Sequence, residues 1–452
     1  MKIIVVGCGK IGTAIISGLV NEGHDVVAID NSPAIINDTS NMYDVICVQG
    51  NGADYDTLLQ ADANDADVVI AVTGSDEFNM LSCFIAKRMG TKHTIARIRN
   101  PEYNDKNSVF MKKQLELSLS INPEFSAAQE IFNLLKLPTA LNIETFSRRN
   151  FKLVEILLKA DSKLDGMNLM SIRKKYSGKY LICVVQRGEE VFIPDGSFVL
   201  KDGDRIAVTA EPAEIHKFLK NLSIMQKSAK NVMILGASKT AYYLAKMLIA
   251  SGNSVKVIDL NQRVCEEFSA SLPEALVVNG DGAEQEVLFE EGISDTDAFV
   301  SLTGMDEENI LISVFASSQN VPKVITKVNR KELGAMATKL GLDSVISPKN
   351  IVADEVLSYV RAVRNSLGSN VETLYKIMDN KAEAVEFNVQ QDFKFAGVSI
   401  KDMKFKDNIL IAGILRGRRA IIPSGDDIFL PDDKVIVIAA GKQLNDLSDI
   451  FE

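Results

Sequence analysis

The chain carries one order of motifs twice, and this internal repeat is the feature that most limits its fold. Three pairs of segments show it: "VVGCGKIG" (5–12) with "ILGASKTA" (234–241), "GNGA" (50–53) with "GDGA" (280–283), and "VTGSDEFN" (72–79) with "LTGMDEEN" (302–309). The spacing is 229 residues at the first pair (236 − 7) and 230 at the third (303 − 73). Chance similarity would not hold register over such a length, so the chain is a duplication.

Within each copy, short apolar runs alternate with helix-like segments. This alternation predicts an α/β fold, with a Rossmann-like, doubly wound parallel sheet in each copy. Each sheet is followed by a segment of short strands and turn dipeptides, which predicts a small α+β domain. The expected domains, in chain order large, small, large and small, are 1–135, 140–225, 228–365 and 370–452, with joints near 136–148, 221–230 and 366–378.

Bulk properties exclude some classes of protein. A net charge of −10 argues against a protein that grips nucleic acid phosphates. The five cysteines form no CxxC pair, as expected of buried, reduced thiols in a cytosolic protein. We expect no cleavable leader before "MKIIVVGCGKIG" and no membrane span, because no apolar stretch approaches about 18–20 residues. The sequence therefore predicts a soluble, cytoplasmic protein.

The first glycine turn has the spacing of a dinucleotide-binding site. It comprises Gly7, Cys8, Gly9, Lys10, Ile11 and Gly12. Gly7 permits the tight turn, Gly9 lets the backbone approach a pyrophosphate, and Gly12 allows close helix–strand contact. Asp30, at the end of the next strand, is placed to bind adenosine ribose hydroxyls, which favours NAD-type ligands or adenine nucleotides over NADP. The alternative is a turn of the same shape that binds nothing.

Two further motifs follow later strands of the first copy. Thr73 and Gly74 are expected at the carboxyl edge of the sheet, where open α/β sheets bind ligands. Ser75 or Asp76 is expected to cap the helix that follows. Arg97 and Arg99, two residues apart, are expected on one face of a strand, where they suit a phosphate. A surface pair of salt bridges is the alternative for these arginines.

The second copy keeps some of these residues and changes others. Its candidate ligand residues are Gly236, Ser238, Lys239, Thr240, Asp259, Asp281, Gly282, Thr303, Gly304 and Lys327. Ser238 stands where the first copy has Gly9, and its side chain would occupy the space of the pyrophosphate. Asn329 replaces the second arginine. Whether this second site is occupied stays open.

Groups for catalysis are not evident in the sequence. Hydride transfer needs an acid or base beside the reacting carbon, and the three histidines, His24, His93 and His216, sit where structural roles are expected. No HExxH or Cys/His metal spacing occurs. We therefore expect that the protein is not an enzyme and that it has no metal site. An NAD-dependent dehydrogenase with its substrate between the halves, and a nucleotide-responsive controller of gene expression, are the competing hypotheses.

The motif order, with "VAID", "ARIRNPEY" and "LDG…IPDG…LKDGD", resembles the TrkA family, the cytoplasmic subunits of bacterial and archaeal Trk potassium-uptake systems. The resemblance covers essentially the whole chain. It implies two RCK units, NAD(H), ATP or ADP as ligands, and a homo-oligomeric ring, expected to be a tetramer, beneath a membrane potassium-translocating subunit whose gating it regulates. It adds the Asn51–Gly52 turn to the expected nucleotide pocket. Whether the small domains bind a second effector or only make subunit contacts stays open.

Overall fold

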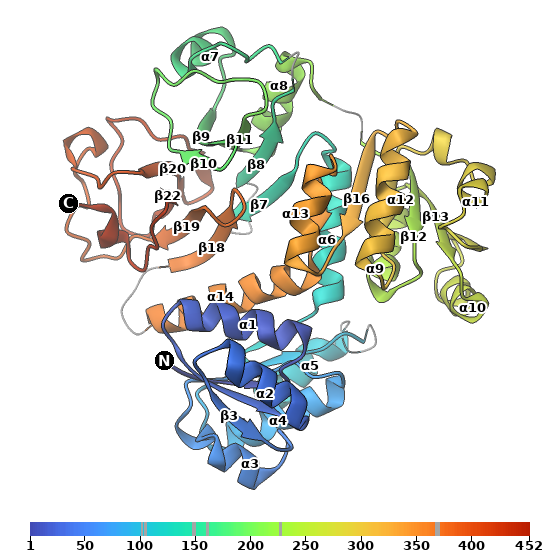
Figure 1. The fold of residues 1–452 in the computed structure, drawn as a ribbon. Helices are drawn as coiled ribbons and strands as arrows, with labels where there is room; N and C mark the ends of the chain where they lie inside the picture. Colours follow the sequence, from blue (N-terminus) through green and yellow to red (C-terminus); the bar gives the residue numbers. More distant parts are fainter. Residues whose placement is uncertain (101–102, 104–105, 147–150, 160–161, 226–227, 367–370) are drawn as a thin grey trace. The chain divides into compact units, whose positions relative to one another are not determined.

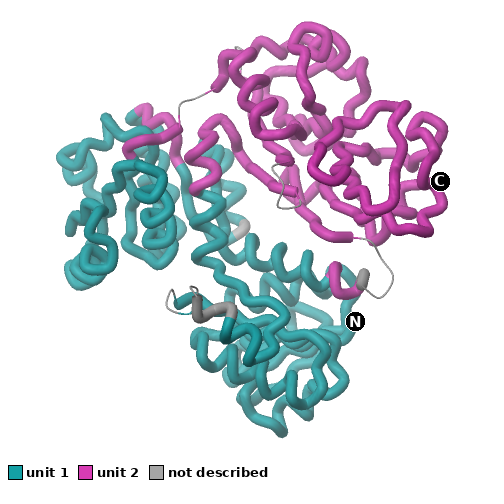
Figure 2. Tube along the Cα trace, turned by 180° about the vertical axis from the view of Figure 1, so that it is seen from behind, with its two compact units in different colours: residues 1–131, 232–319, 325–360 teal, residues 132–231, 320–324, 361–452 magenta. Residues whose placement is uncertain are grey.

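The computed structural model describes the chain except residues 101–102, 104–105, 147–150, 160–161, 226–227 and 367–370. Within these described residues, four sheets follow one another along the chain, two of six strands and two of five (Figure 1). The chain divides into two compact units (Figure 2). Unit 1 comprises residues 1–131, 232–319 and 325–360, and unit 2 comprises residues 132–231, 320–324 and 361–452.

The first sheet has the strand order β3-β2-β1-β4-β5-β6, and every pair in it is parallel. Its strands are β1 (Lys2–Val6), β2 (Asp25–Asp30), β3 (Ile46–Gln49), β4 (Val68–Ala71), β5 (His93–Arg97) and β6 (Leu119–Ile121). Its helices are α1 (Lys10–Asn21), α2 (Pro33–Met42), α3 (Tyr55–Gln60), α4 (Asp76–Met89), α5 (Lys106–Gln114) and α6 (Pro123–Lys136). The order reverses between β1 and β4, which is where sheets of this type bind ligands.

Alternation along β1 divides the core into two layers. Ile3 and Val5 join one buried cluster, and Ile4 and Val6 join another on the opposite face. Both faces are therefore covered, as the continuous apolar runs of a parallel sheet predict. This confirms the predicted doubly wound fold.

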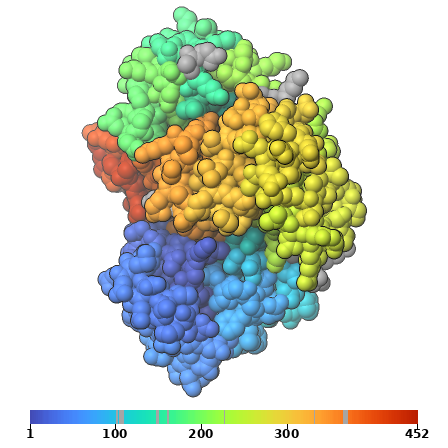
Figure 3. All heavy atoms as spheres, turned by 45° about the vertical axis from the view of Figure 1, so that its right-hand side comes forward, coloured from blue at the N-terminus to red at the C-terminus, as the bar shows by residue number. Residues whose placement is uncertain are grey.

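The second sheet repeats the same topology, β14-β13-β12-β15-β16-β17. Its strands are β12 (Asn231–Leu235), β13 (Ser254–Asp259), β14 (Leu276–Asn279), β15 (Ala298–Ser301), β16 (Lys323–Lys327) and β17 (Val345–Ile346). Its helices are α9 (Lys239–Ala250), α10 (Gln262–Ser271), α11 (Gln285–Glu290), α12 (Asp306–Ser318), α13 (Lys331–Lys339) and α14 (Pro348–Ser366). In the space-filling view, this half (yellow to orange) lies directly against the first (blue) (Figure 3).

Helix α14, from the second copy, covers the sheet of the first. Its buried residues Val352, Val356 and Leu357 belong to the cluster around Ile3 and Val5. The Leu357 side chain lies so close to Gly18 of α1 that a Cβ there would be 2.5 Å from it. The two parallel-sheet domains therefore interlock within unit 1.

The N-terminal end of α6, in the first copy, contacts α9 of the second copy. The Phe125 ring packs edge-on against Tyr243, with 5.4 Å between ring centroids. Asn122 donates a hydrogen bond to the Tyr243 hydroxyl (3.1 Å), which in turn donates to the Arg99 carbonyl (2.9 Å). The sequence patterns missed these crossing contacts.

Unit 2 holds the two small antiparallel sheets. The first, β10-β9-β11-β8-β7, comprises β7 (Asn142–Phe146), β8 (Phe151–Leu157), β9 (Tyr180–Arg187), β10 (Glu190–Phe192) and β11 (Arg205–Ala210), with helices α7 (Leu169–Lys175) and α8 (Pro212–Leu222). The second, β18-β19-β22-β20-β21, comprises β18 (Val371–Ile377), β19 (Ala382–Asn388), β20 (Ile409–Arg416), β21 (Arg419–Ile421) and β22 (Lys434–Ala440).

The two small sheets share one buried cluster, which includes Phe146 and Phe151 from the first and Ala412 and Ile436 from the second. Where the first small domain closes with α8, the second closes with a short 3₁₀ turn, Leu447–Ile450. β7 and β18 lie inside two of the predicted joints, parts of which fall outside the described residues. The exact domain limits stay a prediction.

Among the described residues, no helix combines the length and the apolarity needed to cross a bilayer.

Candidate functional site

The first glycine turn leaves the start of α1 open. Gly7 has a φ of +95°, and a Cβ there would lie 2.9 Å from the Thr73 side chain. A Cβ at Gly12 would lie 1.9 Å from the Gly7 carbonyl oxygen, so both positions require the absence of a side chain. At Gly9, by contrast, a Cβ would meet no atom within 4 Å, and no side chain caps α1. The first backbone N–H groups of α1 are thus accessible to an anion.

Asp30 supports this turn and also faces the cavity beside it. Its carboxylate accepts hydrogen bonds from the Cys8 N–H (2.8 Å) and the Ser32 N–H (2.9 Å). Cys8 itself is buried, and burial, followed by the charge of Asp30, raises the pKa of its thiol to about 12. Cys8 therefore contributes its backbone here, and its side chain does not line the cavity.

The neighbouring strand ends complete one wall. Asn51, Gly52, Thr73 and Gly74 line the cavity, as expected for the carboxyl edge of the sheet. Thr73 is held by Asn79, whose side-chain oxygen accepts from the Thr73 N–H (2.8 Å) and from its hydroxyl (2.7 Å). Ser75 caps α4, because its hydroxyl accepts from the Phe78 N–H at 3.2 Å.

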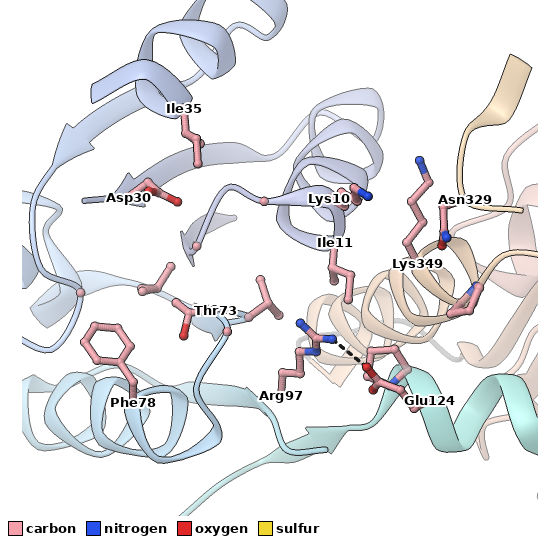
Figure 4. Close-up of a pocket in the computed structure, with 18 of the residues that line it drawn as sticks. Lys10, Ile11, Asp30, Ile35, Thr73, Phe78, Arg97, Glu124, Asn329 and Lys349 are labelled. Carbon is pink, nitrogen blue, oxygen red and sulfur yellow. Dashed lines mark hydrogen bonds and ion pairs between the residues drawn. The ribbon is translucent and has the colours of Figure 1, made fainter. Parts of the chain in front are cut away.

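The two arginines of "ARIRN" do not share one role. Arg97 lines the cavity and pairs with Glu124, with 3.0 Å between Nη2 and Oε1 (Figure 4). Arg99 lies beyond the end of β5, pairs with buried Asp76 at 3.3 Å and donates to the Gly74 carbonyl. Arg99 is not among the residues that line the cavity. Both arginines therefore form ion pairs, as in the salt-bridge alternative, and only Arg97 lines the cavity.

The second glycine turn has the same backbone conformation, but a serine side chain caps the start of the helix that follows it. Gly236 again has a φ of +95°, and Asp259 accepts from the Ala237 N–H (2.7 Å) and the Asn261 N–H (2.8 Å). The Ser238 hydroxyl accepts from the Ala241 N–H at 3.3 Å and so caps α9. A group that Gly9 leaves free in the first copy is therefore already satisfied in the second.

The other second-copy candidates hold their own loops. The Asp281 side chain accepts from the Ala283 N–H (2.9 Å). The Thr303 N–H donates to Asn309 (2.9 Å), but its hydroxyl donates to Glu308 (3.0 Å), whereas the Thr73 hydroxyl donates to Asn79. A Cβ at Gly282 would lie 2.1 Å from Leu235, whereas Gly304 faces open space.

A cavity of about 920 Å³ is lined by residues of both copies, all of which belong to unit 1. The first copy contributes the glycine turn, Asp30, Arg97 and Glu124, and the second contributes Ser238, Lys239, Thr240, Lys327, Asn329, Pro348 and Lys349. The remaining second-copy candidates do not line it: Gly236, Asp259, Asp281, Gly282, Thr303 and Gly304. The two turns were predicted as separate sites. Phe78 lies within the motif "VTGSDEFN" but was not predicted as a site residue, and no motif includes the further lining residues Ile35, Pro123, Glu124, Pro348 and Lys349.

The charge of the cavity suits an anion. Five cationic side chains line it (Lys10, Arg97, Lys239, Lys327 and Lys349), against the two carboxylates of Asp30 and Glu124. Lys327 donates to the Leu302 carbonyl at 3.2 Å, and burial lowers its pKa despite the nearby charges of Asp306 and Glu124. Within the described part of the chain, no cluster of three or more potential metal ligands is present.

The open turn, the carboxylate at Asp30 and the apolar side chains of Ile35 and Phe78 fit an adenosine diphosphate moiety. The carboxylate has lone pairs left for ribose hydroxyls. The α1 N–H groups and Lys10 suit the phosphates. The space over Gly9 allows the close backbone approach that a pyrophosphate needs.

Comparison with known proteins agrees with this architecture. The TrkA-N domain model matches residues 3–112 and 232–348, and the TrkA-C domain model matches residues 153–223 and 384–452. The crystal structure of the GsuK RCK domain has the same fold, with a TM-score of 0.64 and 16% identity over 97% of this chain and 92% of that one. A structure of the GsuK channel bound to NAD gives a TM-score of 0.65 at 16% identity, over 97% of this chain and 76% of that one. The fold therefore defines a protein of tandem RCK, or TrkA, repeats.

Full-length relatives identify the family more closely. The chain is 31% identical to a Trk system potassium uptake protein TrkA homolog of Archaeoglobus fulgidus, over 100% of both chains. It is 29% identical to the TrkA protein of Vibrio alginolyticus, over 100% of this chain and 99% of the other. The chain belongs to the TrkA family.

Proposed function

We propose that this protein is the regulatory subunit of a Trk-type potassium-uptake system. In this proposal it binds NAD(H), ATP or ADP in the cavity at the first glycine turn and regulates a membrane subunit that carries potassium. It works on the cytoplasmic face of the membrane as a homo-oligomeric ring, which we expect to be a tetramer. Binding is the signal, and the nucleotide is not consumed.

The open start of α1 is the observation that carries the proposal. A Cβ at Gly9 would meet no atom within 4 Å, which would leave space for a pyrophosphate, and Asp30 lines the same cavity, where its carboxylate would accept from ribose hydroxyls. The relatives from Archaeoglobus fulgidus and Vibrio alginolyticus are named as Trk potassium uptake proteins, and the GsuK channel of similar fold was solved with NAD. Ligand binding that favours one arrangement of linked domains is enough to regulate a partner.

A binding experiment with an altered turn tests the nucleotide site. Equilibrium titrations with NADH and ATP are compared between the wild type and Gly9→Asp. The new carboxylate would occupy the open space beside the phosphates, so we expect affinity to fall at least about 100-fold, or ~2.7 kcal/mol. Ser40→Asp is the matched control, because Ser40 is exposed on α2 of the same domain and does not line the cavity. Equal affinity in Gly9→Asp and wild type would refute the site.

Three further measurements test the regulatory role against its alternatives. Potassium flux through vesicles that contain the membrane subunit should depend on added wild-type protein and respond to nucleotide, and Gly9→Asp should lose the response. Steady conversion of NAD to NADH with a small hydroxy or amino acid would instead favour the dehydrogenase hypothesis. Salt-sensitive DNA binding would favour a controller of gene expression.

A further inference from the structure

The fifth strand of the second parallel sheet carries a lysine at each end. β16 runs from Lys323 to Lys327, and strand alternation places these two residues on the same face. Lys327, at the carboxyl end, lines the cavity, whereas Lys323 does not. A strand of this length spans only about 13 Å between its ends. β16 therefore links the cavity directly to the groups that Lys323 contacts.

Lys323 contacts the segment 137–141, the first joint, which connects α6 to β7. Its ammonium group donates to the Pro138 carbonyl (3.0 Å) and to the Ala140 carbonyl (2.8 Å). Lys323 is only 6% exposed, and Ala140 is fully buried. A buried charged group is stable only where hydrogen bonds replace those it made with water. These two bonds therefore stabilise both the lysine and the joint.

The first joint is hydrogen-bonded in turn to the first small sheet. The Ala140 N–H donates to the Leu137 carbonyl (2.9 Å), which closes the turn after α6. The Leu141 N–H donates to the carbonyl of Glu155 on β8 (2.8 Å). Movement of Pro138 and Ala140 would thus reach β8 through the next residue of the chain.

The two compact units share β16. Lys323 and Val324 belong to unit 2, as do the first joint and the small sheets. The other three residues of the strand belong to unit 1, as do the residues that line the cavity. β16 lies between β15 and β17 in its sheet, so hydrogen bonds hold it on both sides. Such a strand is a rigid element, and displacement of one end is passed to the other.

The first copy makes a different contact at the equivalent position. His93 begins β5 as Lys323 begins β16, and the spacing of 230 residues (323 − 93) is that of the neighbouring repeated motifs. His93 Nδ1 lies 3.1 Å from the hydroxyl of Tyr359 on α14, within unit 1. The strand start thus meets a helix in one copy and a joint in the other.

We propose that Lys323 is a positioning residue that couples the cavity to the first small domain by fixing the first joint to β16. This proposal rests on the proposed nucleotide site. A bound phosphate would compete with the Leu302 carbonyl for the Lys327 ammonium, which donates to that carbonyl at 3.2 Å. The resulting shift of β16 moves Lys323 and the two carbonyls that it holds. Packed elements respond to such shifts by changing between discrete arrangements.

The test measures hydrogen exchange and nucleotide affinity in the full-length wild type and in Lys323→Met. Methionine has nearly the length of lysine but donates no hydrogen bond. We expect NADH and ATP to change the exchange rates of the Ala140 and Leu141 N–H groups about threefold in the wild type. In Lys323→Met this change should be lost. Dissociation constants should stay within about threefold of the wild type, because linkage limits the change in affinity to the size of the coupling.

Lys256→Met is the matched control. The Lys256 ammonium also donates to a backbone carbonyl of the same domain, that of Glu291, but Lys256 lies on β13 and does not line the cavity. This variant should keep the response of the joint to nucleotide. Loss of the response in Lys256→Met as well would show general damage to the domain and would overturn the specific role of Lys323.

A second variant keeps the proposal testable if Lys323→Met does not fold. The amide of Lys323→Gln can donate to one of the two carbonyls, so this variant should show a smaller response than the wild type. A response equal to that of the wild type in either variant, or no response in a wild type that binds nucleotide, would overturn the coupling. If the wild type binds neither NADH nor ATP, the proposed function itself fails.

Discussion

The two parallel-sheet domains keep the same supporting contacts and differ at the residues that face the cavity. Asp30 and Asp259 each accept one backbone N–H from a glycine turn and one from the residue two positions after the aspartate. Asp76 and Asp306 each accept two backbone N–H groups after the fifth strand. At the cavity, Gly9 becomes Ser238, Arg97 becomes Lys327 and Glu124 becomes Lys349.

This difference separates what a Rossmann-like turn needs to fold from what it needs to bind. A turn can keep its positive-φ glycine and its aspartate while its helix start is closed by a serine. The second copy then retains the architecture, and its α9 start, Lys327 and Lys349 serve the cavity of the first. Three predictions test this division, in order of decreasing effect.

The aspartates should have equal structural roles and unequal ligand roles. Asp30→Ala and Asp259→Ala each leave two backbone N–H groups without their acceptor, so each should lower the free energy of unfolding by about 1–3 kcal/mol. Nucleotide affinity should fall at least about tenfold further in Asp30→Ala, which also loses the ribose contact. Chemical denaturation and equilibrium titration measure the two effects. Equal losses of affinity in both variants would remove the distinction between the copies.

Exchanging Gly9 and Ser238 between the starts of α1 and α9 should partly exchange the stability of the helix starts and the affinity for nucleotide. Gly9→Ser should gain a cap for α1, stabilise the protein by a few tenths of a kcal/mol and weaken nucleotide binding about tenfold, because the side chain enters the open space. Ser238→Gly should cost a few tenths of a kcal/mol. Thermal unfolding with and without ligand measures both. Unchanged affinity in Gly9→Ser would mean that the pyrophosphate does not lie over Gly9.

The smallest expected effect is the contribution of Lys327 to the pH dependence of the free energy of unfolding. Burial holds the pKa of Lys327 below its ordinary value, whereas the unfolded chain keeps that value, about 10.4. Between the two pKa values the unfolded chain binds more protons, so the contribution of Lys327 to stability rises with pH in that window. Lys327→Arg should remove this rise, because arginine does not titrate there. Denaturant unfolding between about pH 8 and pH 10 would detect it, and identical slopes for both proteins would contradict it.

Local patterns in the sequence predicted much of the fold. Apolar runs and glycine turns located the parallel strands and the starts of α1 and α9, because these depend on residues close together in the chain. The short strands β6 and β17, and the helices α6 and α14 after them, were missed. The strands are only three and two residues long and pair with β5 and β16 of their own copies, so they give little periodic signal. Helices α14 and α6 contact the other copy, which no local pattern reports.

The candidate site was predicted in part for the same reason. Gly7, Gly9, Asp30, Thr73 and Gly74 follow from the motif and line the cavity. Arg99 was expected beside Arg97 on one face of a strand, but β5 ends at Arg97 and Arg99 does not line the cavity. Glu124 and Lys349 could be found only once helix starts from both copies were seen to meet at one place. A proline followed by a charged residue after each last strand was the available signal.

The position of α14 on the first sheet has a consequence for how such a chain can be divided. A fragment that ends before residue 348 would leave the surface of Ile15, Ile16 and Leu19 without its cover of Val352, Val356 and Leu357. Two half-length chains could bury that surface only by exchanging their last helices. In one polypeptide the second copy supplies this cover, so the first glycine turn always lies beside residues of a different sequence from its own.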